Sequence, residues 1–239
     1  MGGSAVGGRM EIAGCDAPED RLYDLENEVW WKEEPDGTAL VGVLATFGSF
    51  AGLIRELRFR PVEGRLGRGR SLATVESARL TGAVRVPVDV ELVAKNPEVA
   101  RRPRLLNDAP YAEGWVARVR AVRPEEPRAV LGPLPSVRSA LEAMIRDRRI
   151  RCWPKVPEVE LNEVGSECSA ILVRLNEALA SLGPGSALLL VTDDPTSPIE
   201  MVRWSDQTGE LLRLHRPEGP LHHFLVEKLE HPVPRRPRR

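Results

Sequence analysis

Cysteine, lysine and long apolar runs are all scarce in this 239-residue chain. The three cysteines, Cys15, Cys152 and Cys168, are odd in number and widely spaced, so neither a disulfide framework nor a zinc site is indicated and we expect free thiols. No stretch approaches the ~20 consecutive apolar residues that span a bilayer, and the first residues lack the charged and apolar regions of a secretory signal. We therefore expect a cytoplasmic protein with no membrane partner.

The rest of the composition is that of an ordinary globular protein. Hydrophobic residues make up 42% of the chain, the formal net charge is −1, and the length favours two small domains. Because the charge is balanced, we expect the basic tail at residues 232–239 to be solvated, frayed from residue 235 on, and without a nucleic-acid partner. His222 and His223 are adjacent in a predicted strand, where successive side chains point to opposite faces. They cannot both face one ion, so we expect no metal site.

Short apolar stretches separated by turn signals fill residues 21–121. Pro35-Asp36-Gly37 is a strong turn signal that joins two such stretches in a hairpin. The strands are expected at residues 28–32, 39–43, 55–60, 71–77, 84–88, 91–94 and 114–119. Many short strands with Gly-rich turns are typical of a barrel or sandwich. Residues 1–20 show no periodicity and are expected to be flexible, whereas residues 137–147 are expected to form a helix on the barrel.

The C-terminal part of the chain alternates helical and strand patterns. Residues 170–182 repeat apolar positions at helical spacing, and Pro184-Gly185 ends the run. Ser197 and Glu200 predict a capping box that opens a second helix to about residue 207. Strands are expected near residue 160 and at residues 187–191, 211–216 and 222–228. The order strand, helix, strand, helix, strand, strand predicts a two-layer α/β sandwich.

Residues 23–121 resemble the glycine cleavage system H protein, a lipoyl-type domain. The segments that carry the resemblance are Glu28–Trp31, Asp36-Gly37, Val41-Gly42, Pro61–Gly64, Val75–Arg79, Pro87-Val88, Asn96 and Leu106–Trp115. In that family a Glu-Ser-Val-Lys sequence sits on a hairpin tip and its lysine carries lipoic acid, whereas here Glu76 and Ser77 precede Arg79. A guanidinium stays charged and does not form the amide, so we expect no lipoate. Arg79 is then either a plain surface residue or a docking point for an acidic partner or a sulfur anion.

Residues 158–230 resemble the TusA-type sulfur carriers. In that family a small domain begins with a strand, presents a Cys-Pro pair at the start of its first helix, ends that helix with Pro-Gly, and continues into a strand that ends in Asp-Asp-Pro. Cys168, Pro184-Gly185 and Asp193-Asp194-Pro195 follow the same order, with Ser169 in place of the proline. The helix N-terminus favours a thiolate at Cys168, and the Glu167 carboxylate opposes it.

The second resemblance implies a sulfur carrier that holds sulfane sulfur as a persulfide on Cys168. The implied partners are a cysteine desulfurase, a rhodanese or a heterodisulfide-reductase-like complex, with the H-protein-like domain as a docking module. Asp193 and Asp194 are a paired-carboxylate candidate for binding, although a loop and helix-entry role is the interpretation we favour. The alternative is a non-catalytic adaptor or regulatory protein in which both carrier sites are degenerate.

The expected architecture is therefore an all-β barrel-sandwich hybrid of the lipoyl type with a C-terminal helix, followed by a TusA-like two-layer α/β sandwich. The expected boundaries are residues 1–20 for the flexible segment, 21–150 for the first domain, 151–158 for a linker, 159–231 for the second domain and 232–239 for the tail.

Overall fold

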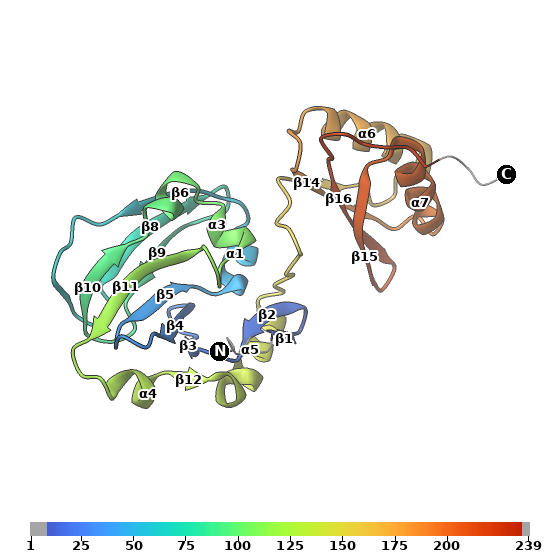
Figure 1. Ribbon diagram of the computed structural model, residues 1–239. Helices are drawn as coiled ribbons and strands as arrows, with labels where there is room; N and C mark the ends of the chain where they lie inside the picture. The colour runs from blue at the N-terminus through green and yellow to red at the C-terminus, as the bar shows by residue number, and fades with distance from the viewer. Residues whose placement is uncertain (1–8, 236–239) are drawn as a thin grey trace, which may run out of the picture. The chain divides into compact units, whose positions relative to one another are not determined.

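The computed structural model describes residues 9–235, apart from the side chains of Arg9 and Cys168. The chain divides into two compact units, Met1–Val156 and Pro157–Arg239, which we call unit 1 and unit 2. The division lies inside the segment 151–158. Figure 1 traces the elements of each unit in order.

Unit 1 is rich in antiparallel β-structure. Its seven-stranded sheet has the order β12 (Gly132–Pro133), β3 (Leu22–Asp24), β4 (Val29–Glu33), β5 (Ala39–Val43), β11 (Trp115–Ala121), β10 (Val90–Lys95) and β7 (Arg65–Leu66). A second sheet has the order β6 (Ile54–Phe59), β8 (Ser71–Ser77) and β9 (Thr81–Arg85), and β1 (Arg9–Ile12) pairs with β2 (Cys15–Pro18). The helices are α1 (Ala45–Ala51), α2 (Pro97–Arg101), α3 (Leu105–Asp108), α4 (Glu126–Val130) and α5 (Leu134–Asp147).

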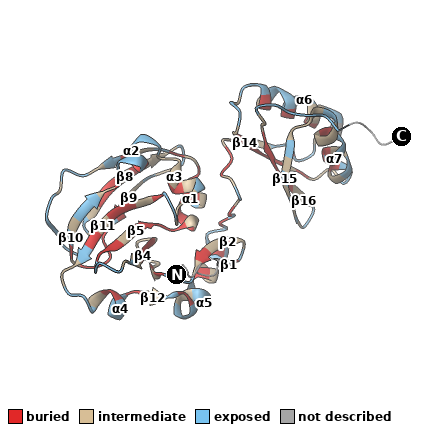
Figure 2. Cartoon of the chain, viewed as in Figure 1, coloured by how far each residue is buried: buried red, intermediate tan, exposed pale blue. Residues whose placement is uncertain are grey.

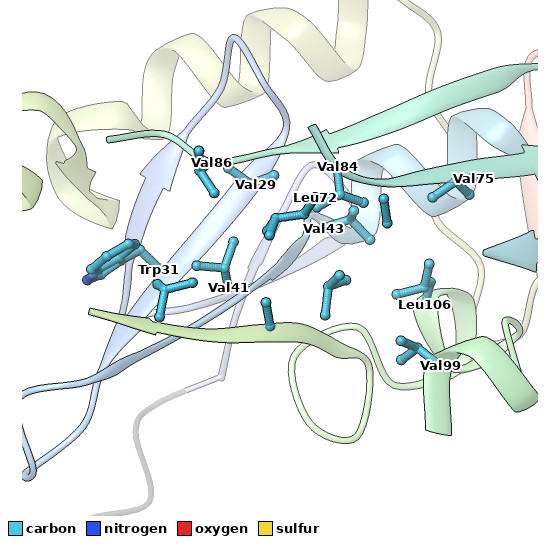
Figure 3. Packing of buried hydrophobic residues seen from close by; sticks show 14 of the residues in the cluster. Val29, Trp31, Val41, Val43, Leu72, Val75, Val84, Val86, Val99 and Leu106 are labelled. Carbon is cyan, nitrogen blue, oxygen red and sulfur yellow. The ribbon is translucent and has the colours of Figure 1, made fainter. Parts of the chain in front are cut away.

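The main core of unit 1 lies between its two larger sheets. Figure 3 shows Val41 and Val43 of β5 facing Leu72 of β8 and Val84 of β9 across this core. Buried residues run along β5 and β8 (Figure 2), and β9 contributes Val84, because side chains on one face of each strand point into the core. The β-rich sandwich predicted for this part of the chain is confirmed.

Strand β4 is covered on both faces. Val29 and Trp31 point into the main core, whereas Trp30 packs in a second cluster with β1, β2 and α5. Gly42 pairs with Trp30 across the sheet, and a Cβ added to Gly42 would lie 2.5 Å from the indole ring. Strand β4 therefore accommodates the Trp30 indole only because the paired residue of β5, Gly42, has no side chain.

The N-terminal segment corrects two predictions. Residues 9–18 form the β1–β2 hairpin, so a flexible lead-in is wrong for them, and residues 1–8 lie outside the described residues. Cys15 is buried and forms a disulfide with Cys152, so the prediction of free thiols is wrong for this pair. The two cysteines are 137 residues apart in sequence, and only the packing of the hairpin beside α5 brings them together.

Unit 2 contains a four-stranded sheet with the order β13 (Val159–Asn162), β14 (Ala187–Thr192), β16 (Leu221–Glu227) and β15 (Leu211–Glu218). Strands β13 and β14 are parallel, and the other two pairings are antiparallel. Helices α6 (Cys168–Ala180) and α7 (Ser197–Thr208) share one core with the sheet, in which Leu175 and Trp204 meet Leu188 and Phe224. The predicted order of strands and helices is confirmed.

Residues 233–235 lie against the C-terminal end of α7. The backbone N–H of Arg235 donates to the carbonyl of Asp206 at 2.7 Å. Gly209, which ends α7 in the left-handed region (φ 78°), has no room for a Cβ because the backbone of Val233 would lie 2.4 Å away. The prediction that residues 235–239 are frayed is therefore wrong at Arg235, and residues 236–239 lie outside the described residues. In the described part of the chain no helix is long and apolar enough to cross a membrane.

Candidate functional site

The first candidate site is the tip of the β8–β9 hairpin in unit 1. Glu76 and Ser77 end β8, and the tip follows at residues 78–80. The Ser77 hydroxyl accepts hydrogen bonds from the backbone N–H groups of Arg79 (3.2 Å) and Leu80 (3.1 Å), and it donates to the carbonyl of Ala51 at 2.8 Å. Ser77 therefore shapes the tip and fastens it to the end of α1.

Arg79 is exposed at this tip, and its stem runs along Gly52. A Cβ added to Gly52 would lie 3.3 Å from Cδ and 3.4 Å from Nε of Arg79. Gly52 follows α1 with φ of 75°, a conformation that glycine adopts without strain. The tip therefore presents a permanently charged guanidinium on a well-supported backbone.

Asn107 holds together the segment on which the tip rests. Its amide nitrogen donates to the carbonyls of Gly48 (3.1 Å) and Gly52 (3.0 Å), and its amide oxygen accepts from the N–H of Ile54 at 2.9 Å. One side chain thus satisfies three backbone groups around the end of α1. Asn107 lies in the segment Leu106–Trp115, which is part of the resemblance to the H protein. Nothing in that sequence pattern predicted the three hydrogen bonds of its side chain.

The second candidate site lies at one edge of the unit 2 sheet. Because β13 and β14 are parallel, their carboxyl ends meet at this edge, and the loops that follow them lie side by side. The backbone N–H of Gly165 in the first loop donates to Asp193 Oδ1 in the second at 2.7 Å. A hollow of about 610 Å³ lies here, lined by Gly165, Ser166, Glu167, Ser169, Asp193, Asp194, Pro195 and Thr196.

Cys168 is the first residue of α6, immediately beside this hollow. Its side chain lies outside the described part of the structure. Glu167 occupies the N-cap position with an extended backbone, and in the described structure its carboxylate makes no capping hydrogen bond. The positive end of the α6 macrodipole favours an anion at this end of the helix.

The loop before α6 is anchored by a buried acid. Glu163 is 6% exposed, and its Oε2 accepts from the Ser166 hydroxyl at 2.8 Å and pairs with the Arg174 guanidinium. Arg174 lies in α6, so the pair ties the loop to its own helix. Sequence reasoning missed this pair, because the two residues are 11 positions apart and belong to different elements.

Asp194 organises the start of α7. Its Oδ1 accepts from both the N–H and the hydroxyl of Thr196, each at 2.8 Å. Ser197 begins α7, is buried, and donates its hydroxyl to the Asp194 carbonyl at 2.7 Å, so the predicted capping box is wrong. Asp193 and Asp194 thus have the loop and helix-entry contacts that we favoured from sequence.

The predicted residues therefore fall into two groups. Glu167, Ser169, Asp193 and Asp194 surround one hollow at the start of α6, whereas the residues of the Arg79 tip belong to the other unit. Within the described residues, no group of three or more His, Cys, Asp or Glu side chains is arranged to hold a metal ion.

Comparison with known proteins decides the family of unit 1. The family model described as "Glycine cleavage H-protein" matches residues 21–139. Glycine cleavage system H protein 5 of Aquifex aeolicus is 32% identical over 145 residues, which are 59% of this chain and 98% of that protein. The chain belongs to the glycine cleavage H-protein family.

Other H proteins match over a similar part of the chain. The probable glycine cleavage system H protein 2 of Sulfurisphaera tokodaii is 31% identical over 143 residues, 59% of this chain and 96% of that protein. A solved glycine cleavage system H protein from Mycobacterium marinum covers 44% of this chain and 87% of its own, with 23% sequence identity and a TM-score of 0.41.

The H-protein hairpin tip of this chain does not fit a lipoyl group. The resemblance assigns the lipoylated lysine of the family to the position of Arg79. Lipoylation forms an amide with an amine that loses a proton. The guanidinium of Arg79 stays protonated and is not such an amine. Ser77 has a structural role that needs no cofactor, because its hydroxyl builds the turn.

Proposed function

We propose that the chain is a sulfur carrier that holds sulfane sulfur as a persulfide on Cys168. The observation that carries the proposal is the position of this residue at the first turn of α6, beside the 610 Å³ hollow at the carboxyl edge of the sheet. The strand and helix order of unit 2 and the resemblance to TusA-type carriers support the same role. The H-protein unit then serves as a docking module without a lipoyl arm.

The chemistry requires only a thiolate and a donor persulfide. The Cys168 thiolate attacks the terminal sulfur of the donor, a new S–S bond forms on Cys168, and the donor cysteine leaves as a thiolate. Acceptor transfer is the same exchange in reverse: an acceptor thiolate takes the terminal sulfur and Cys168 returns to its thiolate. Both steps conserve electrons, so neither needs an oxidant or a reductant.

Two electrostatic effects compete at this position. The N-terminal end of α6 favours the anionic thiolate and persulfide. Glu167 is adjacent in sequence, and Asp193 and Asp194 line the same hollow, so three carboxylates disfavour a further negative charge. A protein donor that docks with a basic surface offsets those carboxylates, so we expect faster loading from such a donor than from polysulfide.

The donors and acceptors expected for such a carrier are a cysteine desulfurase, a rhodanese or a heterodisulfide-reductase-like complex. Transfer is tested by loading the full-length protein with polysulfide and then releasing sulfane sulfur with cyanide, which yields thiocyanate. We expect one thiocyanate per chain from the wild type and none from Cys168→Ser. A variant in which Cys15 and Cys152 are both serine is the matched control and should release as much as the wild type. Equal release from Cys168→Ser would refute the proposal.

A second candidate is an adaptor or regulatory protein in which both carrier sites are degenerate. The observations in its favour are Arg79 at the lipoyl position and the carboxylates around the hollow. In that case the wild type releases no thiocyanate with any donor, while affinity capture still recovers a stable partner complex.

A further inference from the structure

Two histidines face each other across the β15–β16 hairpin of unit 2. His215 lies in β15 opposite Phe224, and His222 lies two residues before Phe224 in β16, so the two imidazoles are diagonal neighbours on one face of the sheet. Nε2 of His215 and Nδ1 of His222 are 3.0 Å apart. The sequence-based rejection of a metal site compared His222 with His223, its neighbour along the chain, whereas its neighbour in space is His215.

A buried phenylalanine of the unit 2 core, Phe224, packs against the ring of His215. His215 stacks on Phe224 with ring centroids 4.5 Å apart and planes at 13°, and Phe224 is fully buried. The ring of His222 is tilted 40° to that of His215 at 5.1 Å. His215 is exposed and His222 is half-buried, so solvent reaches the pair while Phe224 limits the rotation of one ring. The nitrogens are thus preorganised before any ligand arrives.

The facing nitrogens are suited to share a cation. In the hydrogen bond between them one nitrogen donates its proton and the other offers a lone pair, so at least one ring is neutral. The neutral imidazole nitrogen with its lone pair is the form that ligates metals. Metal–nitrogen bonds of ~2.0–2.1 Å in a tetrahedral site place two ligand nitrogens about 3.3 Å apart. The distance between the two nitrogens therefore needs to increase by a few tenths of an ångström, and the rings need to turn so that both lone pairs point at an ion beside the line that joins the nitrogens.

We propose that His215 and His222 form a binding site for one divalent transition-metal ion of the zinc, nickel or copper class, in which the ion replaces the shared proton. Two imidazoles are borderline ligands that suit these ions and not calcium or magnesium. Water completes the coordination on the exposed side. The site lies at the same edge of the sheet as the hollow beside α6, because His222 pairs with Thr192, the last residue of β14.

The proposal is independent of sulfur transfer and is tested with zinc alone. The full-length protein is titrated with a zinc salt by calorimetry, and the histidine ring nitrogens are followed by NMR. We expect one saturable site, with affinity reduced at least about tenfold in His215→Gln and in His222→Gln, since the loss of outer-shell contacts alone costs 10–100-fold. Glutamine retains a polar side chain of similar length, and a thermal unfolding curve checks that each variant folds.

Two control variants test whether zinc binds to other side chains of the protein instead. His231→Ala removes an exposed histidine of the same unit, and Cys168→Ser removes a thiol; both should bind zinc as the wild type does. Zinc binding that survives in His215→Gln and His222→Gln, or that disappears in Cys168→Ser, would overturn the assignment. The absence of any saturable binding by the wild type would overturn it as well.

Discussion

Reduction of the Cys15–Cys152 disulfide should destabilise unit 1 strongly. The cross-link joins the β1–β2 hairpin to the segment that follows α5, and the two cysteines are 1% and 7% exposed. For a sequence separation of 137 residues the chain-entropy relation gives about 5 kcal/mol at 25 °C. Measured values for disulfides are typically about 2–4 kcal/mol, because reduced chains retain some structure. We therefore expect the free energy of unfolding of unit 1 to fall by about 2–5 kcal/mol.

The assay is urea unfolding of the full-length protein, with and without dithiothreitol, followed by hydrogen exchange of peptides from each unit. Peptides of unit 1 should lose protection at a lower urea concentration after reduction, and peptides of unit 2 should not change. Cys168→Ser is the matched control, since it removes the third cysteine and leaves the cross-link intact. Identical unfolding midpoints for the oxidised and reduced protein would refute the reasoning.

Three further substitutions test the packing of unit 1 and the hairpin tip. Asn107→Ala should lower stability by about 1–3 kcal/mol in urea unfolding, because three backbone groups lose their partner, whereas Asn27→Ala, which removes one local contact, should cost less. Gly42→Ala should cost about 1–3 kcal/mol by forcing the Trp30 ring aside. A cost no larger than that of Gly67→Ala, where the added Cβ would meet only Asp89 Oδ1 at an ordinary contact distance of 3.7 Å, would contradict the packing. Arg79→Lys should gain a lipoyl group from a lipoate ligase, as seen by intact mass, and lipoylation of the wild type would contradict the assignment of this position.

Patterns that are local in sequence predicted most elements of this protein. The strand at Ser71–Ser77 and the helix and strand order of unit 2 follow from alternation and helical spacing. The strand expected at residues 84–88 is observed as Thr81–Arg85 instead. Val84, Val86 and Val88 are all fully buried, so the apolar alternation is genuine, but the ladder with β8 ends at Arg85. Within this stretch, the alternation of buried residues continues to Val88, beyond Arg85, the last residue of β9 that pairs with β8.

Features that depend on distant partners were not predictable in this way. Cys15 and Cys152 meet through the packing of a hairpin beside α5, and neither has a neighbouring cysteine to signal it. Glu163 and Arg174 belong to a loop and a helix, and His215 meets His222 only because the β15–β16 register places them diagonally. Each of these pairs depends on the tertiary arrangement and not on a local propensity.

The central claim is that Cys168 carries sulfur, and intact mass spectrometry tests it most directly. Full-length wild-type protein and Cys168→Ser are incubated with a cysteine desulfurase and cysteine, and in parallel with polysulfide. The carrier account predicts the added mass of one sulfur atom on the wild type, removed by a thiol reductant and absent from the variant. An unchanged wild-type mass with both donors, or the same adduct on Cys168→Ser, would contradict it.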